Sequence, residues 1–151
     1  MQKVTPFLWF NDQAEEAAHS YCSVFANSRV VSRMAGPGGK AMSATFEIEG
    51  QQFIAFNGGP HYQLTPAISL FVDCHSQAEV DELWDKLCQG GAPNRCGWLT
   101  DRYGLSWQII PSLLGELLQD KDAARAQRAM EAMLKMDKID LELLRKAGAG
   151  E

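Results

Sequence analysis

Hydrophobic and polar positions along the first half of the chain predict a strand, a helix and three further strands. Residues 3–10 are apolar and aromatic, which is typical of a strand. Asp12 and Glu15 have the spacing of a capping box and predict the start of a helix. Three more strands are expected, the last two as a hairpin around Glu49-Gly50: residues 29–34, 41–48 and 52–57.

The same pattern begins again in the second half. Residues 67–73 predict a strand, and Ser76 with Glu79 predicts a second capping box. Gly90-Gly91 is expected to stop this helix, and short strands follow near residues 95–100 and 105–110. The apolar stripe expected on this helix is Val80, Leu83, Trp84 and Leu87.

The two halves also share short sequence motifs. "TPFLWFNDQAEE" (5–16) resembles "TPAISLFVDCHSQAEV" (65–80), with Thr-Pro before each strand and Gln-Ala-Glu opening each helix. A repeat of this kind determines the architecture. We therefore predict an α+β fold of two βαβββ modules within residues 1–111, about 1–60 and 61–111.

Residues 112–151 are expected to form a helical tail of the same domain. Leucines and methionines recur with helical spacing, and Asp137 is expected to cap the last helix, with Asp140 at its third position. A methionine-rich stripe can grip a flexible partner. The favoured interpretation is that it docks a helix on the core or on a second copy of the chain.

Composition narrows the classes of partner. The formal net charge is -5 and there is no run of Lys or Arg, so neither nucleic acid nor a membrane is expected as a partner. The N-terminal residues lack a signal-peptide pattern, and no apolar run approaches a membrane span, so a cytoplasmic location is expected. Four scattered cysteines are interpreted as reduced thiols: Cys22, Cys74, Cys88 and Cys96.

Alternation along the strands predicts a face that could hold a ligand. Ser106 and Gln108 lie opposite the bulky residues Leu105, Trp107 and Ile109. Apolar walls with a few placed polar groups suit a small-molecule pocket, whereas the competing interpretation is a core whose polar atoms are satisfied internally. The candidate ligand-binding residues are Thr5, Phe7, Trp9, Asn57, His61, Ser69, Trp98 and Gln108.

Several longer motifs resemble a known family. "TPFLWF", "NGGPH", "CGWL" followed by "GLSWQIIP", and "AMEAMLKMDKID" are similar to the PhnB-like branch of the vicinal oxygen chelate (glyoxalase/bleomycin-resistance) superfamily. Members of this branch often carry the label 3-demethylubiquinone 3-methyltransferase. The resemblance implies paired βαβββ modules forming a curved mixed sheet around a cup, usually in a homodimer.

The resemblance also implies where a metal ion would bind. Metal-dependent members use His and Glu on strands 1, 4, 5 and 8. This chain offers neither residue type there, so no metal and no cofactor are expected. A neutral Gln is a weak donor for transition metals. By motif position, the corresponding residues are Thr5, Ile54 or Ala55, Ala67 or Ser69, and Gln108.

Three functions are compatible with these patterns. The favoured one is a protein that binds a small, partly aromatic or amphipathic molecule in a metal-free cup. The first alternative is a glyoxalase- or dioxygenase-type enzyme, either metal-dependent through unorthodox ligands such as His61 and Glu47 or metal-free with His61 as the base. The second is an interaction module that uses the tail. His19 and His75 are expected on the surface. The methyltransferase label is disfavoured, because neither "GPGG" nor "NGGP" follows a strand and opens a helix.

Overall fold

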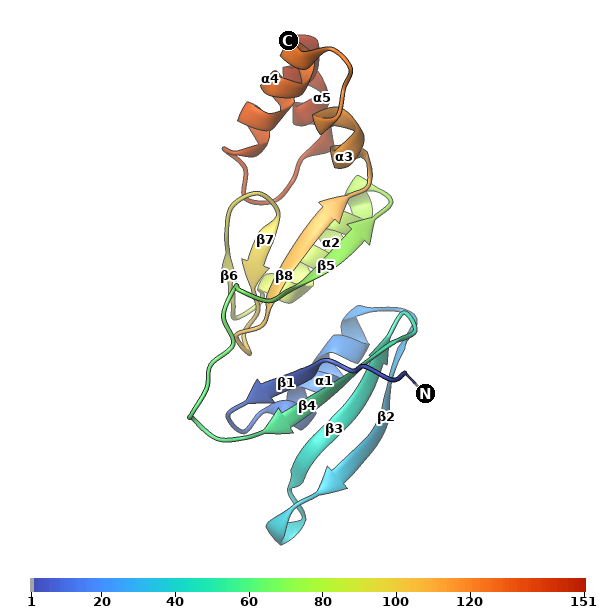
Figure 1. The fold of residues 1–151 in the computed structure, drawn as a ribbon, viewed down its shortest axis with the longest axis vertical. Coiled ribbons are helices and arrows are strands. Elements are labelled where there is room, and N and C mark those ends of the chain that lie inside the picture. Colours follow the sequence, from blue (N-terminus) through green and yellow to red (C-terminus); the bar gives the residue numbers. More distant parts are fainter. Residues whose placement is uncertain (1) are drawn as a thin grey trace. The chain divides into compact units, whose positions relative to one another are not determined.

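The computed structural model describes residues 2–151, which form two compact units (Figure 1). Unit 1 runs to Thr65 and unit 2 from Pro66 to Glu151. Each unit contains one βαβββ module with its own four-stranded mixed sheet, and unit 2 adds three helices. The predicted α+β class and the two βαβββ modules are confirmed.

Unit 1 has the strand order β1-β4-β3-β2. β1 runs parallel to β4, whereas β4, β3 and β2 are antiparallel neighbours. The predicted hairpin at Glu49-Gly50 is therefore confirmed. The elements are β1 (Phe7–Phe10), α1 (Ala14–Val24), β2 (Ser28–Ala35), the short 3-10 helix η1 (Pro37–Gly39), β3 (Ala41–Ile48) and β4 (Gln51–Asn57).

Unit 2 repeats this topology with the order β5-β8-β7-β6. β5 runs parallel to β8, and β7 is antiparallel to both β8 and β6. The two-residue strand β6 was not expected from the sequence, since it contains a proline and has no alternation. The elements are β5 (Ser69–Cys74), α2 (Gln77–Cys88), β6 (Ala92–Pro93), β7 (Trp98–Thr100), β8 (Ser106–Pro111), α3 (Leu113–Leu118), α4 (Ala123–Met133) and α5 (Leu141–Ala149).

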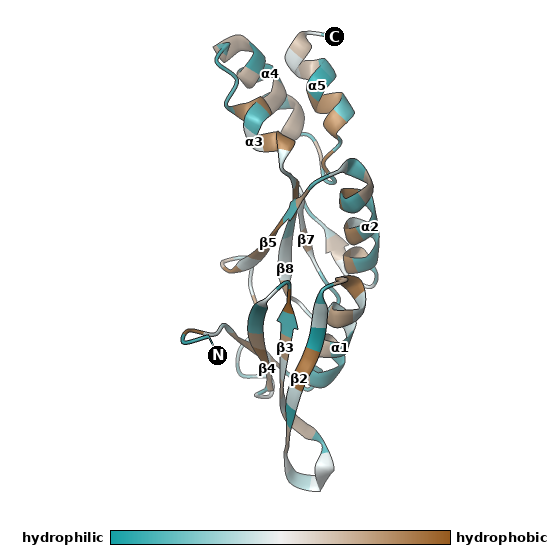
Figure 2. Ribbon diagram, turned by 90° about the vertical axis from the view of Figure 1, so that its right-hand side faces the viewer, coloured by the Kyte–Doolittle hydropathy of each residue, from teal (hydrophilic) through white to brown (hydrophobic). Residues whose placement is uncertain are grey.

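Each module buries one face of its sheet under its own helix (Figure 2). We call this the helix face and the opposite side the far face. In unit 1, Tyr21 of α1 packs against Phe46 of β3 with ring centroids 5.7 Å apart. In unit 2, the whole predicted stripe of α2 is buried, which confirms it: Val80, Leu83, Trp84 and Leu87.

The two predicted capping boxes have different outcomes. Ser76 caps α2, because its hydroxyl accepts a hydrogen bond from the backbone N–H of Glu79 at 3.1 Å. The Asp12 cap is wrong: Gln13 occupies the cap position of α1 without a side-chain bond. The side chain of Asn57 supplies the acceptor instead, at 2.8 Å from the Ala14 nitrogen. The first turn of α1 is therefore capped by Asn57, at the end of β4, and not by the neighbouring residue Asp12.

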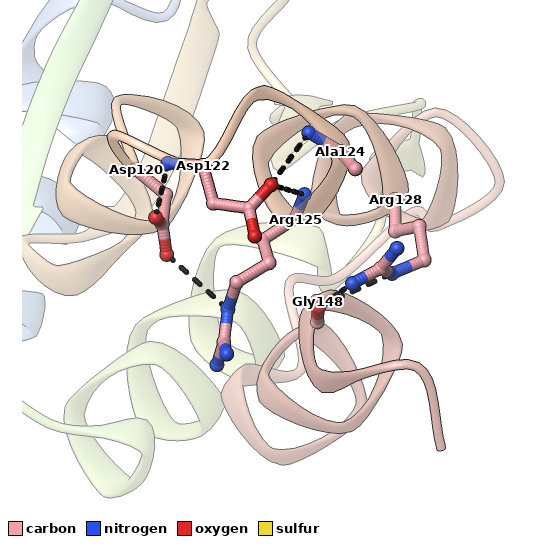
Figure 3. A network of polar contacts seen from close by, with 6 residues as sticks. All are labelled: Asp120, Asp122, Ala124, Arg125, Arg128 and Gly148. Carbon is pink, nitrogen blue, oxygen red and sulfur yellow. Dashed lines mark hydrogen bonds and ion pairs between the residues drawn. The ribbon is translucent and has the colours of Figure 1, made fainter.

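Two of the three tail helices, α4 and α5, begin at aspartates, and Figure 3 shows the one that caps α4. Asp122 accepts hydrogen bonds from the first turn of α4, and Asp140 caps α5 through the Leu143 nitrogen at 3.1 Å. The prediction that Asp137 caps the last helix is therefore wrong. The guanidinium of Arg128 on α4 donates two hydrogen bonds to the Gly148 carbonyl, which ties α4 to α5.

The tail docks on the end of the unit 2 sheet. Ile110 of β8, Leu114, Ile139 and Leu144 form one buried cluster. Gly97 lies directly beneath it with φ +83°, and a methyl group there would lie 2.7 Å from Ile110 Cδ1 and 3.1 Å from Ile139 Cγ1. The expected docking of the tail on the core is therefore confirmed. None of the helices in residues 2–151 has the length and apolar character to cross a bilayer.

Gly97→Ala should destabilise the protein more than Gly104→Ala. Both glycines have positive φ, but an added methyl at Gly104 meets nothing within 4 Å. The Gly104 variant therefore measures the backbone strain alone, about 1–2 kcal/mol. Overpacking at Gly97 should add roughly 1–3 kcal/mol. Urea unfolding measures both, and equal losses would contradict the close packing of the tail.

Candidate functional site

The far face of unit 1 carries a cluster of aromatic rings. Strand register places Phe7 beside Ile54 and Trp9 beside Phe56, opposite the buried Leu8 and Phe10. The rings of Phe7 and Phe56 lie 5.1 Å apart, and those of Trp9 and Phe56 lie 5.3 Å apart. Phe7 and Trp9 therefore share the face that the sequence predicted for them.

The loop after β4 completes this cluster. Gly58 lies against the indole of Trp9, so that a methyl group there would be 2.2 Å from the ring. The indole Nε1 donates a hydrogen bond to the Gly59 carbonyl at 2.9 Å. Tyr62 then places its ring 5.0 Å from Trp9. Gly58 is thus needed for the close approach of the backbone to the indole, whereas Gly59 is favoured by its φ of +84°.

Much of the cluster is accessible to solvent. The side chains of Phe7 and Tyr62 are 55% and 68% exposed. We call Phe7, Trp9, Phe56 and Tyr62 the aromatic cluster. The sequence did not predict Phe56, because alternation along β4 starting at Phe53 selects Ala55 and Asn57, on the opposite face. It did not predict Tyr62, because this residue lies in a loop, where strand periodicity does not apply.

The remaining unit 1 candidates lie elsewhere. Asn57 shares the helix face with Phe53 and Ala55, where it accepts from α1 and donates to the Ala41 carbonyl at 2.9 Å. Its expected position on a ligand face is therefore corrected. Thr5 precedes β1, and its hydroxyl lies 3.4 Å from the Gln2 amide nitrogen. His61 is exposed in the loop beside Tyr62.

The far face of unit 2 is more polar. Gln108 of β8 donates a hydrogen bond from Nε2 to the Ser69 hydroxyl of β5 at 3.0 Å. Trp98 of β7 is in register with Gln108 on the other side and is half-buried. The sequence prediction that Gln108 lies opposite Trp107 is confirmed. In strand register Gln108 lies between Phe71 of β5 and Trp98 of β7, and its amide bonds to the hydroxyl of Ser69, two residues before Phe71.

A buried aspartate holds β8 in this orientation. Asp101 accepts hydrogen bonds from the Tyr103 and Leu105 nitrogens at 2.8 and 3.1 Å and from Trp107 Nε1 at 2.8 Å. Because Trp107 is tied to the helix face, its neighbours Ser106 and Gln108 project to the far face. The turn that the sequence predicted at residues 101–104 thus also orients the strand.

Ser106 lies on the face that the alternation predicted for a ligand, although it is not one of the candidate ligand-binding residues. Its side chain is 1% exposed, and its hydroxyl has no hydrogen-bond partner among residues 2–151. Strand register places it beside Ser69 and Thr100. A buried hydroxyl without a partner costs about 1–3 kcal/mol. The sequence pattern does not reveal that the Ser106 hydroxyl lacks a partner, because Ser is an ordinary small residue on a strand.

Metal-ligating and nucleophilic groups are dispersed. Among the described residues, no three His, Cys, Asp or Glu side chains gather into a possible metal site. All four cysteines are free thiols, as the sequence predicted. Burial raises the pKa of the Cys74 thiol to about 12, with Glu79 and Asp73 adding to the shift. Burial also raises the pKa values of Cys22 and Cys88, so these thiols stay protonated at neutral pH.

Paired βαβββ modules of this topology have the vicinal oxygen chelate fold. The chain belongs to the family described as 3-demethylubiquinone-9 3-methyltransferase, whose model matches residues 2–110. The resemblance seen in the sequence is thereby confirmed.

Solved structures agree with this assignment. A 3-demethylubiquinone-9 3-methyltransferase-like PhnB protein from Bacillus cereus is 36% identical, with a TM-score of 0.69, and the match covers 73% of this chain and 99% of that one. Protein PA1353 from Pseudomonas aeruginosa is 20% identical (TM-score 0.59; 74% and 98% covered). The fosfomycin resistance protein FosX from Listeria monocytogenes shares the fold at 15% identity (TM-score 0.54; 77% and 97% covered). No curated protein matches.

Ser106→Ala should leave stability unchanged or raise it, because the change removes a buried hydroxyl that has no protein partner. Ser28→Ala is the matched control, since the Ser28 hydroxyl donates to the Cys22 carbonyl at 2.8 Å. The control should lose about 0.5–1.5 kcal/mol. Urea unfolding compares the two; a larger loss at Ser106 would show that its hydroxyl is satisfied in solution.

Proposed function

We propose that the protein binds a small, partly aromatic or amphipathic molecule, without a metal ion, and that the far face of each unit offers a binding surface of its own. The observation that carries this proposal is the aromatic cluster of unit 1, in which Phe7 and Tyr62 stay more than half exposed. Contiguous exposed apolar groups of this kind mark binding surfaces in soluble proteins.

The chemistry of the cluster favours a flat apolar ring. Phe7 and Phe56 are tilted by 43°, and the Trp9 ring meets Phe56 and Tyr62 nearly edge-on. Rings in such arrangements can accept a further ring, with about 0.5–1.5 kcal/mol for each aromatic pair. The bond from Trp9 to Gly59 holds the central indole in place, so little side-chain entropy is lost when a ligand binds.

Unit 2 supports the polar part of the proposal. Ser69, Ser106 and Gln108 are neutral and can donate as well as accept hydrogen bonds. Ser106 in particular has an unsatisfied hydroxyl. An uncharged oxygen of a ligand, such as a hydroxyl or a carbonyl, suits these groups better than a carboxylate or phosphate, because strands β5 to β8, all of them described, contain no Lys or Arg.

2-Naphthol, an uncharged amphipathic ring, tests the aromatic cluster. Tyr62→Ala should weaken its binding by about threefold to tenfold through the loss of one ring contact. Tyr103→Ala is the control, since Tyr103 lies beside Arg102 in the turn before β8. Equilibrium dialysis gives both dissociation constants; equal effects in the two variants, or no binding by the unchanged protein, would refute the proposal.

The polar groups of unit 2 are tested by Gln108→Leu. Gln108 is half-buried and its amide bonds to Ser69, so the variant should fold while losing the preference for 2-naphthol over naphthalene. Binding of naphthalene itself should change little. A structural role alone would instead lower the free energy of unfolding and leave the ratio of the two affinities unaltered.

The competing function is an enzyme of the glyoxalase or dioxygenase type, with His61 as the base. This function shares the superfamily fold, but it would need metal ligands outside the expected positions, since Gln108 and Ser69 bond to each other. Elemental analysis of the purified protein distinguishes the two. Stoichiometric zinc, nickel, manganese or iron would favour the enzyme. Transfer of a methyl group, which the family description names, forms no part of the proposal.

The proposal includes a homodimer, in which a second copy covers apolar surface that each chain leaves exposed. Light scattering at micromolar concentration tests it, and a monomer there would contradict this part of the proposal alone.

A further inference from the structure

The connection between α4 and α5 runs alongside the start of β7. The Cys96 nitrogen donates to the Met136 carbonyl at 2.8 Å, and the Gly97 nitrogen donates to the Asp137 carbonyl at 2.7 Å. The tail thus continues the hydrogen bonding of the sheet beyond β7. Cys96 has φ 61° and Gly97 has φ +83°, so two consecutive residues take a left-handed conformation that these bonds help to hold.

A side chain of α2 forms hydrogen bonds to the other side of the connection between α4 and α5. Gln77 donates from Nε2 to the Ile139 carbonyl at 2.9 Å, and its Oε1 accepts from the Leu141 nitrogen at 2.9 Å. Lys138 adds an ion pair to Asp81 of α2 at 3.0 Å. The backbone around Ile139 is therefore held by α2 on one side and by residues 96–97 on the other.

Ile139 packs this anchored connection against the sheet. Its side chain is fully buried in the cluster that contains Ile110. A methyl group added at Gly97 would be only 3.1 Å from Ile139, so the two residues are in close contact. The Gly97 carbonyl also accepts a hydrogen bond from the Ile109 nitrogen at 2.8 Å. The tail therefore touches both strands beside the positions of Trp98 and Gln108.

We propose that Gln77 and Ile139 are positioning residues that hold Trp98 beside Gln108, so that the C-terminal tail sets the ligand affinity of the unit 2 far face. Trp98 directly follows Gly97 in the chain and is in register with Gln108. This inference rests on the proposed binding function. The family match ends at residue 110, so the tail makes this site different from that of relatives that end with the second module.

The test uses the full chain labelled with 5-fluorotryptophan, with the four fluorine signals assigned by single Trp→Phe changes. Gln77→Ala removes both bonds to the tail. Gln127→Ala is the matched control, because the Gln127 amide is exposed on α4 and bonds to Glu131 at 3.0 Å. The Trp9 signal, which comes from unit 1, serves as an internal reference.

Gln77→Ala should shift the Trp98 signal, leave the Trp9 signal in place and weaken 2-naphthol binding at the unit 2 face by about fivefold. Binding there is read from the preference for 2-naphthol over naphthalene, which the Gln108 amide of unit 2 is expected to set. The control should change none of these. If Gln77→Ala does not fold, Ile139→Val, which removes one methyl from the contact, serves as the test with the same expected directions.

An unchanged Trp98 signal, or a shifted signal with unchanged affinity, would overturn the inference. Failure of the proposed function has a different signature. In that case the unchanged protein would not bind 2-naphthol at all, whereas the Trp98 signal would still report whether Gln77 and Ile139 position the indole.

Discussion

The parallel pairing of the first and last strand of each module is the constraint on which the rest of the structure depends. β1 pairs with β4 and β5 with β8, although each pair is separated by a helix and two strands. Parallel neighbours require a long crossover connection, and here the helix in that crossover covers one face of the sheet. The pairing therefore decides which residues lie on the helix face and which lie on the far face.

The two far faces present different chemistry on the same scaffold. In unit 1, Trp9 lies over Gly58, and its ring contacts those of Phe56 and Tyr62. In unit 2, Gln108 joins Ser69, and the hydroxyl of Ser106 is left without a partner among the described residues. The aromatic surface of unit 1 suits an apolar ring, and the neutral hydrogen-bonding surface of unit 2 suits an uncharged polar group, so neither surface needs a charged side chain for the proposed function.

The tail extends this scaffold beyond the part that the family shares. Ile139 fills the space over Gly97, and Gln77 holds the backbone at Ile139 and Leu141. The result is that residues with no place in the βαβββ repeat contact the strands that carry Trp98 and Gln108. A C-terminal tail that packs against β7 and β8 can therefore alter a binding site even where the residues that face the ligand stay the same.

The sequence by itself determined the two modules, the stripe of α2 and the orientation of Gln108 opposite Trp107. These features follow from local periodicity and from short-range signals such as the Ser76 cap, which act within a few residues. Only the tertiary structure decided that Asn57 caps α1 and that Phe56 and Tyr62 join Trp9. The acceptor for α1 and the rings around Trp9 come from residues more than forty positions away. No local pattern records such contacts, because strand register creates them.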